Sequence, residues 1–285
     1  MPDSRPIGFF DSGVGGLTVL REVIRRLPSE STVYLGDNAR APYGPRSDEE
    51  VTRFSAECLD QLAARDVKAI VVACNTASAV ALGTLRRRYD VPILGVVRPG
   101  ATAAALATRT RCVGVIATQA TVRSRAYFQA IKDENPFIEV YEHATPDLVP
   151  LVESGALEGL MVEAAVRHAL GPLLDRREDA DDSVFPIPRD AVIDTLLLGC
   201  THYPLLAPVI TAQVGPGIAV IDSASATSSA LASLLEVNHL LAPTDALPRH
   251  ALYSTGDLRA FQRTNERLFG SFFPTVEPVA LPGAA

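Results

Sequence analysis

The stretch of sequence that decides the fold joins an apolar run to a glycine-rich turn and an amphipathic segment: Pro6-Ile7-Gly8-Phe9-Phe10-Asp11-Ser12-Gly13-Val14-Gly15-Gly16-Leu17-Thr18-Val19-Leu20. Residues 6–10 are almost continuously apolar, which is typical of a strand buried on both faces. After Leu17 the apolar residues recur at helical spacing, at Leu20, Val23, Ile24 and Leu27. A strand followed directly by a helix predicts a parallel α/β fold.

Further apolar runs repeat the strand signal along the chain. They cover residues 32–35, 69–73, 93–97, 113–117, 195–199 and 218–221. Amphipathic segments lie between them, and one begins at Ser47, where Glu50 completes a capping box. Strands that are apolar on both faces belong to parallel sheets covered by helices. The sequence therefore predicts the α/β class with mainly parallel sheets.

The chain also resembles itself in two places. Residues 5–12 align without gaps on residues 111–118, and residues 70–76 align on residues 196–202. In each case an apolar strand is followed by polar residues. Two similar α/β lobes would explain both matches, although any strand-to-helix turn resembles another and chance similarity stays open.

Length and composition bound the class of protein. The 285 residues correspond to two domains of roughly 150 residues, and 47% hydrophobic and 21% charged residues fit a globular chain. No apolar run reaches the roughly 18 residues that a membrane span needs, and no signal-peptide pattern follows Met1. We therefore expect a cytoplasmic protein. A formal net charge of −7 has the wrong sign for direct contact with nucleic acid or an anionic membrane.

The turn at residues 11–16 is a candidate anion site, because its backbone N–H groups lie at the start of the predicted helix. A dinucleotide site is the obvious reading, with Asp37 about 20 residues further on as the ribose-binding acid. The spacing argues against it, since Thr18 stands where the third glycine of that motif is required. A tight turn would explain the glycines but not Asp11 or Ser12.

The four cysteines form no C-x-x-C pair, which argues against both disulfides and a zinc knuckle in a non-secreted chain. Cys58, on a helical apolar face, and Cys112, at the start of a strand, fit small buried hydrophobic residues. Cys74 and Cys200 each follow an apolar strand directly and precede small polar residues. Ligands of open α/β folds bind beyond the carboxyl ends of strands, so both thiols are expected to face a pocket. His202 is well placed to tune the Cys200 thiol.

Two thiols in matching positions favour a reaction with acid–base groups on opposite faces of one substrate. Racemisation at a carbon acid has this requirement, and a thiol with a reference pKa of about 8.5 can serve on either side. The alternative, pyridoxal phosphate, needs a lysine, and neither Lys68 nor Lys132 is well placed for it. The histidines show no paired metal-ligand spacing. We therefore expect neither a cofactor nor a metal.

Several blocks of this sequence resemble the bacterial glutamate racemases. They are Phe10-Asp11-Ser12-Gly13-Val14-Gly15-Gly16-Leu17-Thr18-Val19, Gly36-Asp37, Pro42-Tyr43-Gly44, Ala73-Cys74-Asn75-Thr76-Ala77-Ser78 and Leu198-Gly199-Cys200-Thr201-His202-Tyr203-Pro204-Leu205-Leu206. They stand in the family's order and, with weaker blocks between them, extend from residue 7 to about residue 223, which leaves only the tail after about residue 240 weakly covered.

The resemblance implies interconversion of L- and D-glutamate without a cofactor, which supplies D-glutamate for peptidoglycan. It implies two pseudo-symmetric α/β lobes, residues 1–98 plus 208–285 and residues 99–207, with the active site between them. Cys74 would act on the D-enantiomer and Cys200 on the L-enantiomer. Because the family commonly forms dimers, a homodimer is expected.

The resemblance also implies a set of supporting residues. Substrate binding falls to Asp11, Ser12, Tyr43, Gly44, Asn75, Thr76, Thr118, Thr121, Thr201 and His202. Asp11, Glu153 and His202 are implied to assist proton transfer, and Asp37 to belong to the same network. Simpler interpretations stay open for some of them: a helix-end charge for Glu153 and a turn former for Asp37.

Two other functions stay open. One is a racemase or isomerase that acts on aspartate or another small dicarboxylate, since pocket length decides between them. The other is a non-catalytic amino-acid-binding protein. The charged segment 175–190 is expected to be a solvated loop, and the tail after His239 to be irregular apart from a helix over residues 258–269.

Overall fold

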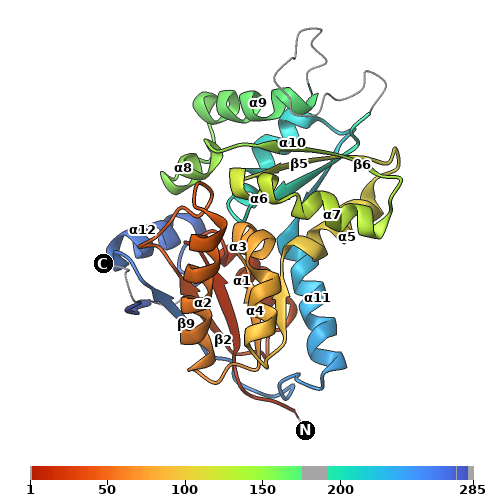
Figure 1. Cartoon of the computed structure of the whole chain (residues 1–285). Coiled ribbons are helices and arrows are strands. Elements are labelled where there is room, and N and C mark those ends of the chain that lie inside the picture. The colour runs from red at the N-terminus through yellow and green to blue at the C-terminus, as the bar shows by residue number, and fades with distance from the viewer. Residues whose placement is uncertain (1, 175–191, 274, 282–285) are drawn as a thin grey trace.

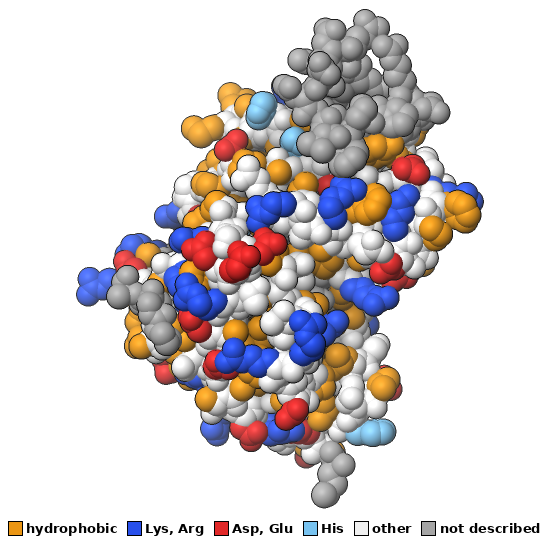
Figure 2. Space-filling model, viewed as in Figure 1, with side chains coloured by type: hydrophobic (Ala, Val, Ile, Leu, Met, Phe, Trp, Pro, Cys, Tyr) orange, Lys and Arg blue, Asp and Glu red, His pale blue; other side chains and the backbone are white. Residues whose placement is uncertain are grey.

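The computed structural model describes residues 2–174, 192–273 and 275–281, so the charged segment predicted as a loop lies outside the described residues. Figure 1 shows two α/β lobes, with the N-terminus at the end of the first lobe that lies away from the second. On the face drawn in Figure 2, basic side chains are interspersed with acidic ones over both lobes.

A six-stranded sheet forms the centre of the first lobe, with every pair of neighbours parallel, in the order β10-β9-β2-β1-β3-β4. Its strands are β1 (Ile7–Asp11), β2 (Thr32–Gly36), β3 (Ala69–Val72), β4 (Ile93–Gly95), β9 (His250–Ser254) and β10 (Val276–Pro278). The strands β1, β2 and β3 are buried along their whole length, which explains why the sequence shows them as continuous apolar runs.

Helices cover both faces of this sheet. One core cluster packs the sheet against α1 (Leu17–Arg26), α11 (Ser223–Val237) and α12 (Leu258–Phe269). A second packs the other face against α2 (Asp48–Ala63), α3 (Asn75–Val80) and α4 (Leu82–Arg88). The predicted capping box is present, because the side chain of Ser47 accepts from the Glu50 N–H and the Glu50 carboxylate accepts from the Ser47 N–H. Among the described residues no helix combines the length and apolar character that a membrane crossing requires.

The second lobe has a four-stranded parallel sheet in the order β6-β5-β7-β8. Its strands are β5 (Cys112–Ala117), β6 (Glu139–Ala144), β7 (Thr195–Gly199) and β8 (Ala219–Asp222). The helices α5 (Val97–Ala107) and α7 (Ala126–Glu134) pack on one face. The other face carries α8 (Leu148–Glu153), α9 (Leu160–Leu174), the 3-10 helix η1 (Tyr203–Leu206) and α10 (Ala207–Val214), while α6 (Gln119–Ser124) follows β5.

The two sheets repeat one order of strands. The first lobe contains β2-β1-β3-β4 and the second β6-β5-β7-β8, with β9 and β10 added only to the first. The self-similar segments of the sequence fall on equivalent strands, β1 with β5 and β3 with β7. The prediction of two similar α/β lobes with parallel sheets is therefore confirmed.

The structure differs from the prediction at the edges of the sheets. The strand β6 escaped notice because its sequence, Glu-Val-Tyr-Glu-His-Ala, is half polar, as an edge strand allows. The helix predicted over residues 258–269 is present, but β9 and β10 flank it in a tail expected to be irregular. The strand β8 pairs with β7, so residues 219–222 belong by hydrogen bonding to the second sheet. The division of the chain into 1–98 plus 208–285 and 99–207 otherwise stays a prediction.

Candidate active site between the lobes

Most of the predicted site residues lie in the turns that follow β1, β3, β5 and β7, at the carboxyl ends of the strands, where the two lobes meet (Figure 1). The others are Asp37, Tyr43 and Gly44, which follow β2, and Glu153, which ends α8. Hydrogen bonds join these turns across the interface. The Thr18 hydroxyl in the first lobe donates to the Thr201 carbonyl in the second at 3.1 Å, and the Ala120 N–H donates to the Gly44 carbonyl at 3.2 Å. The turns of one lobe therefore lie directly against those of the other.

Cys74 stands at the N-cap of α3 and is 4% exposed. Its sulfur accepts from the Ala77 N–H at 3.5 Å, and its thiol donates to the Ser12 hydroxyl at 3.4 Å. Burial raises the pKa of Cys74 to about 12, and the charge of Asp11 acts in the same direction, against the hydrogen bonds with Ser12 and Ala77. The thiol is therefore protonated at neutral pH.

Asp11 lies at the end of β1 and is fully buried. Its carboxylate accepts from the Gly13 N–H at 2.9 Å and from the Thr201 hydroxyl, in the other lobe, at 3.5 Å. Burial raises the pKa of Asp11, opposed by the charge of His202 and by backbone N–H groups. This carboxylate therefore takes up a proton more easily than an exposed aspartate does.

The glycines of the first turn allow close packing around Asp11. A Cβ on Gly15 would lie 2.6 Å from Nδ1 of His202, and one on Gly16 would lie 2.6 Å from the Cβ of Asp11. Both approaches are too short for any side chain. Gly15 thus allows the contact between the lobes and Gly16 the packing around Asp11 within the first lobe, which explains glycines that the dinucleotide motif does not.

Cys200 is 5% exposed. A histidine contacts its sulfur, and a carboxylate contacts that histidine. The Cys200 sulfur lies 3.7 Å from Nδ1 of His202, and Nε2 of that ring donates to Glu153 at 3.2 Å. Burial by itself lowers the pKa of His202, but the hydrogen bonds to Cys200 and Glu153 and their charges outweigh it and raise the pKa to about 10. At neutral pH an imidazolium therefore stands beside the Cys200 sulfur.

A cluster of hydroxyl groups lies beside Cys74. The Thr76 and Thr118 hydroxyls are 2.9 Å apart, the Thr118 and Thr121 hydroxyls 3.0 Å and the Thr76 and Thr121 hydroxyls 3.5 Å. Thr76 belongs to the first lobe, and Thr118 and Thr121 begin α6 of the second. Hydroxyl groups from two lobes can together hold a carboxylate.

Tyr43 and Asp37 do not face the thiols with their side chains. The Tyr43 hydroxyl donates to Asp37 at 2.5 Å, and the fully buried Asp37 also accepts from Arg40 at 2.7 Å and from the Thr255 hydroxyl at 2.7 Å. Arg40 makes a further ion pair with Glu57. These contacts form a buried support beneath the loop that carries Gly44.

Several residues of this arrangement were not predicted from the sequence. Arg40 and Thr255 hold Asp37, and Tyr127 on α7 accepts from the Asn75 side-chain amide at 2.6 Å. Tyr127 lies inside a helix, Arg40 follows the Gly36-Asp37 block without belonging to it, and Thr255 follows β9 in the tail that was expected to be irregular. Only the three-dimensional contacts identify them.

Cys74 follows β3 of the first sheet and Cys200 follows β7 of the second, so the two thiols come from opposite lobes. One has a carboxylate nearby and the other an imidazolium, which allows one thiol to take up a proton while the other gives one. In the described part of the chain no three His, Cys, Asp or Glu side chains gather in a way that could hold a metal ion.

A matched pair of parallel α/β lobes, each with a buried cysteine after an equivalent strand, defines a two-lobed class of enzyme with paired thiols. The model of the Asp/Glu/hydantoin racemase family matches residues 11–231, and the chain belongs to this family.

Individual relatives extend the likeness over nearly the whole chain. The glutamate racemase of Exiguobacterium sibiricum is 44% identical over 91% of this chain and 90% of its own, and that of Geobacter metallireducens is 44% identical over 97% of both chains. The crystal structure of glutamate racemase isoform RacE1 from Bacillus anthracis has a TM-score of 0.88, 41% identity and 98% coverage of both chains. Glutamate racemase from Francisella tularensis, solved in complex with D-glutamate, has a TM-score of 0.85 at 34% identity and covers 98% of both chains.

Proposed function

We propose that this protein is a glutamate racemase that interconverts L- and D-glutamate with two thiols and no cofactor. The observation that carries the proposal is the pair of buried cysteines, 4% and 5% exposed, that follow the equivalent strands β3 and β7 at the carboxyl ends of the two sheets. Membership of the racemase family and the similarity to glutamate racemases over nearly the whole chain support the choice of reaction and substrate.

In the proposed reaction, the Cys74 thiolate takes the α-proton of D-glutamate and becomes a thiol, while the electron pair stays on the α-carbon. The Cys200 thiol then gives its proton to the opposite face and becomes a thiolate, which yields L-glutamate. The reverse reaction exchanges the two roles. Because the pKa of Cys74 is about 12 in the free protein, this thiol first has to lose its proton, and the neighbouring Asp11 is the base proposed for that step.

On the other side, His202 and Glu153 are proposed to serve Cys200. The imidazolium, 3.7 Å from the sulfur, places an opposite charge next to the thiolate that forms when Cys200 gives up its proton. Glu153 accepts from the far nitrogen of the ring at 3.2 Å and holds the ring in this orientation. The carboxylate, imidazole and thiol therefore act in series.

The substrate is proposed to lie between the two sulfurs, with its two carboxylates on separate groups of donors. Donors come from the side chains of Ser12, Asn75, Thr76, Thr118, Thr121 and Thr201 and from the backbone of Tyr43 and Gly44. Hydrogen bonds to the α-carboxylate would stabilise the negative charge that develops when the α-proton leaves. The proposal further includes supply of D-glutamate for peptidoglycan and a homodimer, both from the family resemblance. It also includes the cytoplasmic location expected from the sequence pattern.

Aspartate is the alternative substrate. The aspartate racemase of Picrophilus torridus has a TM-score of 0.52 at 20% identity and covers 81% of this chain, a likeness of fold alone. The ratio of kcat/KM for glutamate to that for aspartate decides between the two substrates, and we expect it to favour glutamate.

The experiment that tests the function is incubation of the purified protein with D-glutamate in deuterated water, without pyridoxal phosphate. Optical activity and deuterium at the α-carbon are followed for wild type, Cys74→Ala and Cys200→Ala. We expect wild type to lose optical activity and incorporate deuterium, and each variant to lose racemisation by about 10²–10⁴-fold or more.

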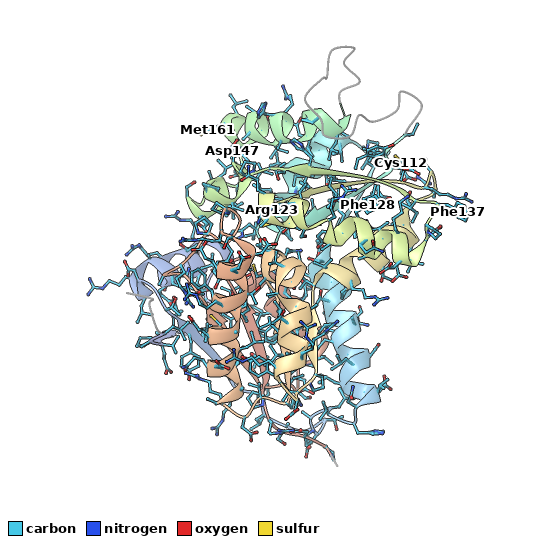
Figure 3. All side chains as sticks on the ribbon, in the orientation of Figure 1. Cys112, Arg123, Phe128, Phe137, Asp147 and Met161 are labelled. Atoms are coloured by element: carbon cyan, nitrogen blue, oxygen red, sulfur yellow. The ribbon has the colours of Figure 1, made fainter. Side chains whose placement is uncertain are left out.

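Cys112→Ala is the matched control. Cys112 is also a buried cysteine, at 4% exposure, but it begins β5, at the end of the strand away from the site (Figure 3). Its replacement is expected to leave racemisation unchanged. A wild type that neither racemises nor exchanges glutamate would overturn the function, whereas full activity in both variants would overturn only the assignment of the thiols.

A further inference from the structure

Tyr127, on α7 of the second lobe, is fully buried and its hydroxyl lies on the first lobe. The hydroxyl accepts from the side-chain amide of Asn75 at 2.6 Å, and Ser223 at the start of α11 lies close enough to it to lower its pKa. Burial raises the pKa of Tyr127 above its usual value, so the hydroxyl keeps its proton at neutral pH.

The ring of Tyr127 packs against the backbone of the second lobe. A Cβ on Gly199 would lie 2.9 Å from Cε2 of this ring, so only glycine leaves the room that the ring occupies. Gly199 is the last residue of β7 and directly precedes Cys200. On its other edge, the ring lies 3.5 Å from the position a Cβ on Gly100 would take.

These contacts place one side chain between the two halves of the site. Asn75 directly follows Cys74 in the first lobe, and Gly199 directly precedes Cys200 in the second. Tyr127 touches both. Ser223, which lies near the Tyr127 hydroxyl, stands where the chain leaves β8 of the second sheet and enters α11 of the first lobe. The tyrosine therefore ties the neighbour of one thiol to the neighbour of the other.

The contact with Tyr127 sets the orientation of the Asn75 side-chain amide. Asn75 is 2% exposed, and its side-chain oxygen has no hydrogen-bond partner among the described residues. The Tyr127 hydroxyl is the partner that fixes the rotation of the amide. An amide held in one orientation binds a carboxylate more tightly than one that must be oriented on binding.

We propose that Tyr127 is a positioning residue of the racemase, which orients the Asn75 amide toward the substrate and holds it in register with the Cys200 half of the site. The inference rests on the proposed function, in which Asn75 binds glutamate. Tyr127 itself takes no part in proton transfer, so its hydroxyl affects substrate binding rather than the acid–base steps.

Tyr127→Phe tests the inference, because it removes the hydroxyl and keeps the ring against Gly199. We expect KM for both glutamate enantiomers to rise about tenfold, with kcat and the pH profile of kcat unchanged. Tyr89→Phe is the matched control, because the hydroxyl of the partly buried Tyr89 also makes hydrogen bonds, with the Ala56 carbonyl at 2.8 Å and the Asp60 carboxylate at 2.7 Å, outside the predicted site. For this variant KM is expected to stay as in wild type.

A double-mutant cycle shows whether Tyr127 acts through Asn75. If it does, Tyr127→Phe combined with Asn75→Ala has the same KM as Asn75→Ala alone. Full additivity of the two effects, or an unchanged KM in a folded Tyr127→Phe variant, would overturn the inference. An inactive wild type would instead overturn the proposed function.

Ser223→Ala provides a second test if Tyr127→Phe does not fold. It removes the Ser223 hydroxyl, which lies near the Tyr127 hydroxyl, and leaves the tyrosine in place. We expect a smaller rise of KM, again without a change of kcat, and an unchanged KM would contradict the positioning role.

Discussion

In the first lobe Cys74 caps the α-helix α3, and its sulfur accepts from the Ala77 N–H with a serine and a carboxylate nearby. In the second lobe Cys200 precedes the 3-10 helix η1, and its sulfur lies beside the His202–Glu153 pair. The strands beneath them have the same order, and the two thiols are equally buried.

The difference between the lobes comes from single positions in matching turns. Cys74-Asn75-Thr76 aligns with Cys200-Thr201-His202, so a hydroxyl in the first lobe occupies the place of an imidazole in the second. Thr76 joins the hydroxyl cluster, whereas His202 carries a charge. A repeated scaffold thus positions both thiols, and the loops give them unlike electrostatic surroundings.

The largest effect on kcat is expected when the histidine beside Cys200, which has no counterpart beside Cys74, is replaced. His202→Asn takes the imidazolium away from Cys200, and we expect kcat to fall by about 10²–10⁴-fold. His143→Asn is the control, because His143 is a half-buried histidine of the same lobe on β6, outside the set of residues around the thiols. Steady-state racemisation at pH 8 measures both. Equal kcat in the two variants would mean that the lobes do not differ in this way.

The second prediction compares the contribution of one buried ion pair in each lobe to the free energy of unfolding. Arg40 is 6% exposed and pairs with the fully buried Asp37, so Arg40→Met leaves a buried carboxylate without its cation. We expect a loss of about 3–5 kcal/mol in the free energy of unfolding, measured by urea denaturation.

Arg125→Met is the corresponding change in the second lobe, where Arg125 is 36% exposed and pairs with the buried Glu142. Burial raises the pKa of Glu142 to about 7, against the effects of Arg125 and the Phe128 N–H. Without Arg125 this carboxyl can take up a proton at neutral pH and avoid a buried charge. We therefore expect a smaller loss than for Arg40→Met. Equal losses would contradict the distinction.

The sequence predicted what depends on local pattern. Apolar runs identified seven of the strands, and the turns after β1, β3 and β7 identified the candidate anion site and the two thiols. Thr118, Thr121 and Glu153 came only from the family resemblance. The sequence could not predict that Tyr43 and Asp37 turn toward Arg40, because that contact requires knowing which side chains lie beneath the loop. Nor could it place Tyr127 against Asn75, since 52 residues separate them and neither neighbourhood indicates the other.

A smaller effect is expected for Glu153, which contacts His202 rather than the Cys200 thiol itself. Glu153→Gln removes the carboxylate that helps to raise the pKa of His202 to about 10. The ring is charged below its pKa, so a lower pKa means that the charge, and the activity that depends on it, is lost at a lower pH. We expect the alkaline limb of the kcat profile to move toward neutral pH. Asp147→Asn, at the other end of α8 (Figure 3), should leave the limb unchanged.

The smallest effect tests how the tail of the first lobe reaches the second. The helix α12 belongs to the first lobe, yet Arg267 donates to the Ser154 carbonyl at 2.5 Å, directly after Glu153, and Leu268 packs against the cores of both lobes. Because the arginine is exposed, we expect Arg267→Gln to lower the free energy of unfolding by only about 1 kcal/mol. Arg263→Gln, one turn earlier on the same exposed face, controls for loss of charge. Equal free energies of unfolding for the two variants in urea would mean that the hydrogen bond from Arg267 to Ser154 does not stabilise the contact between the tail and the end of α8.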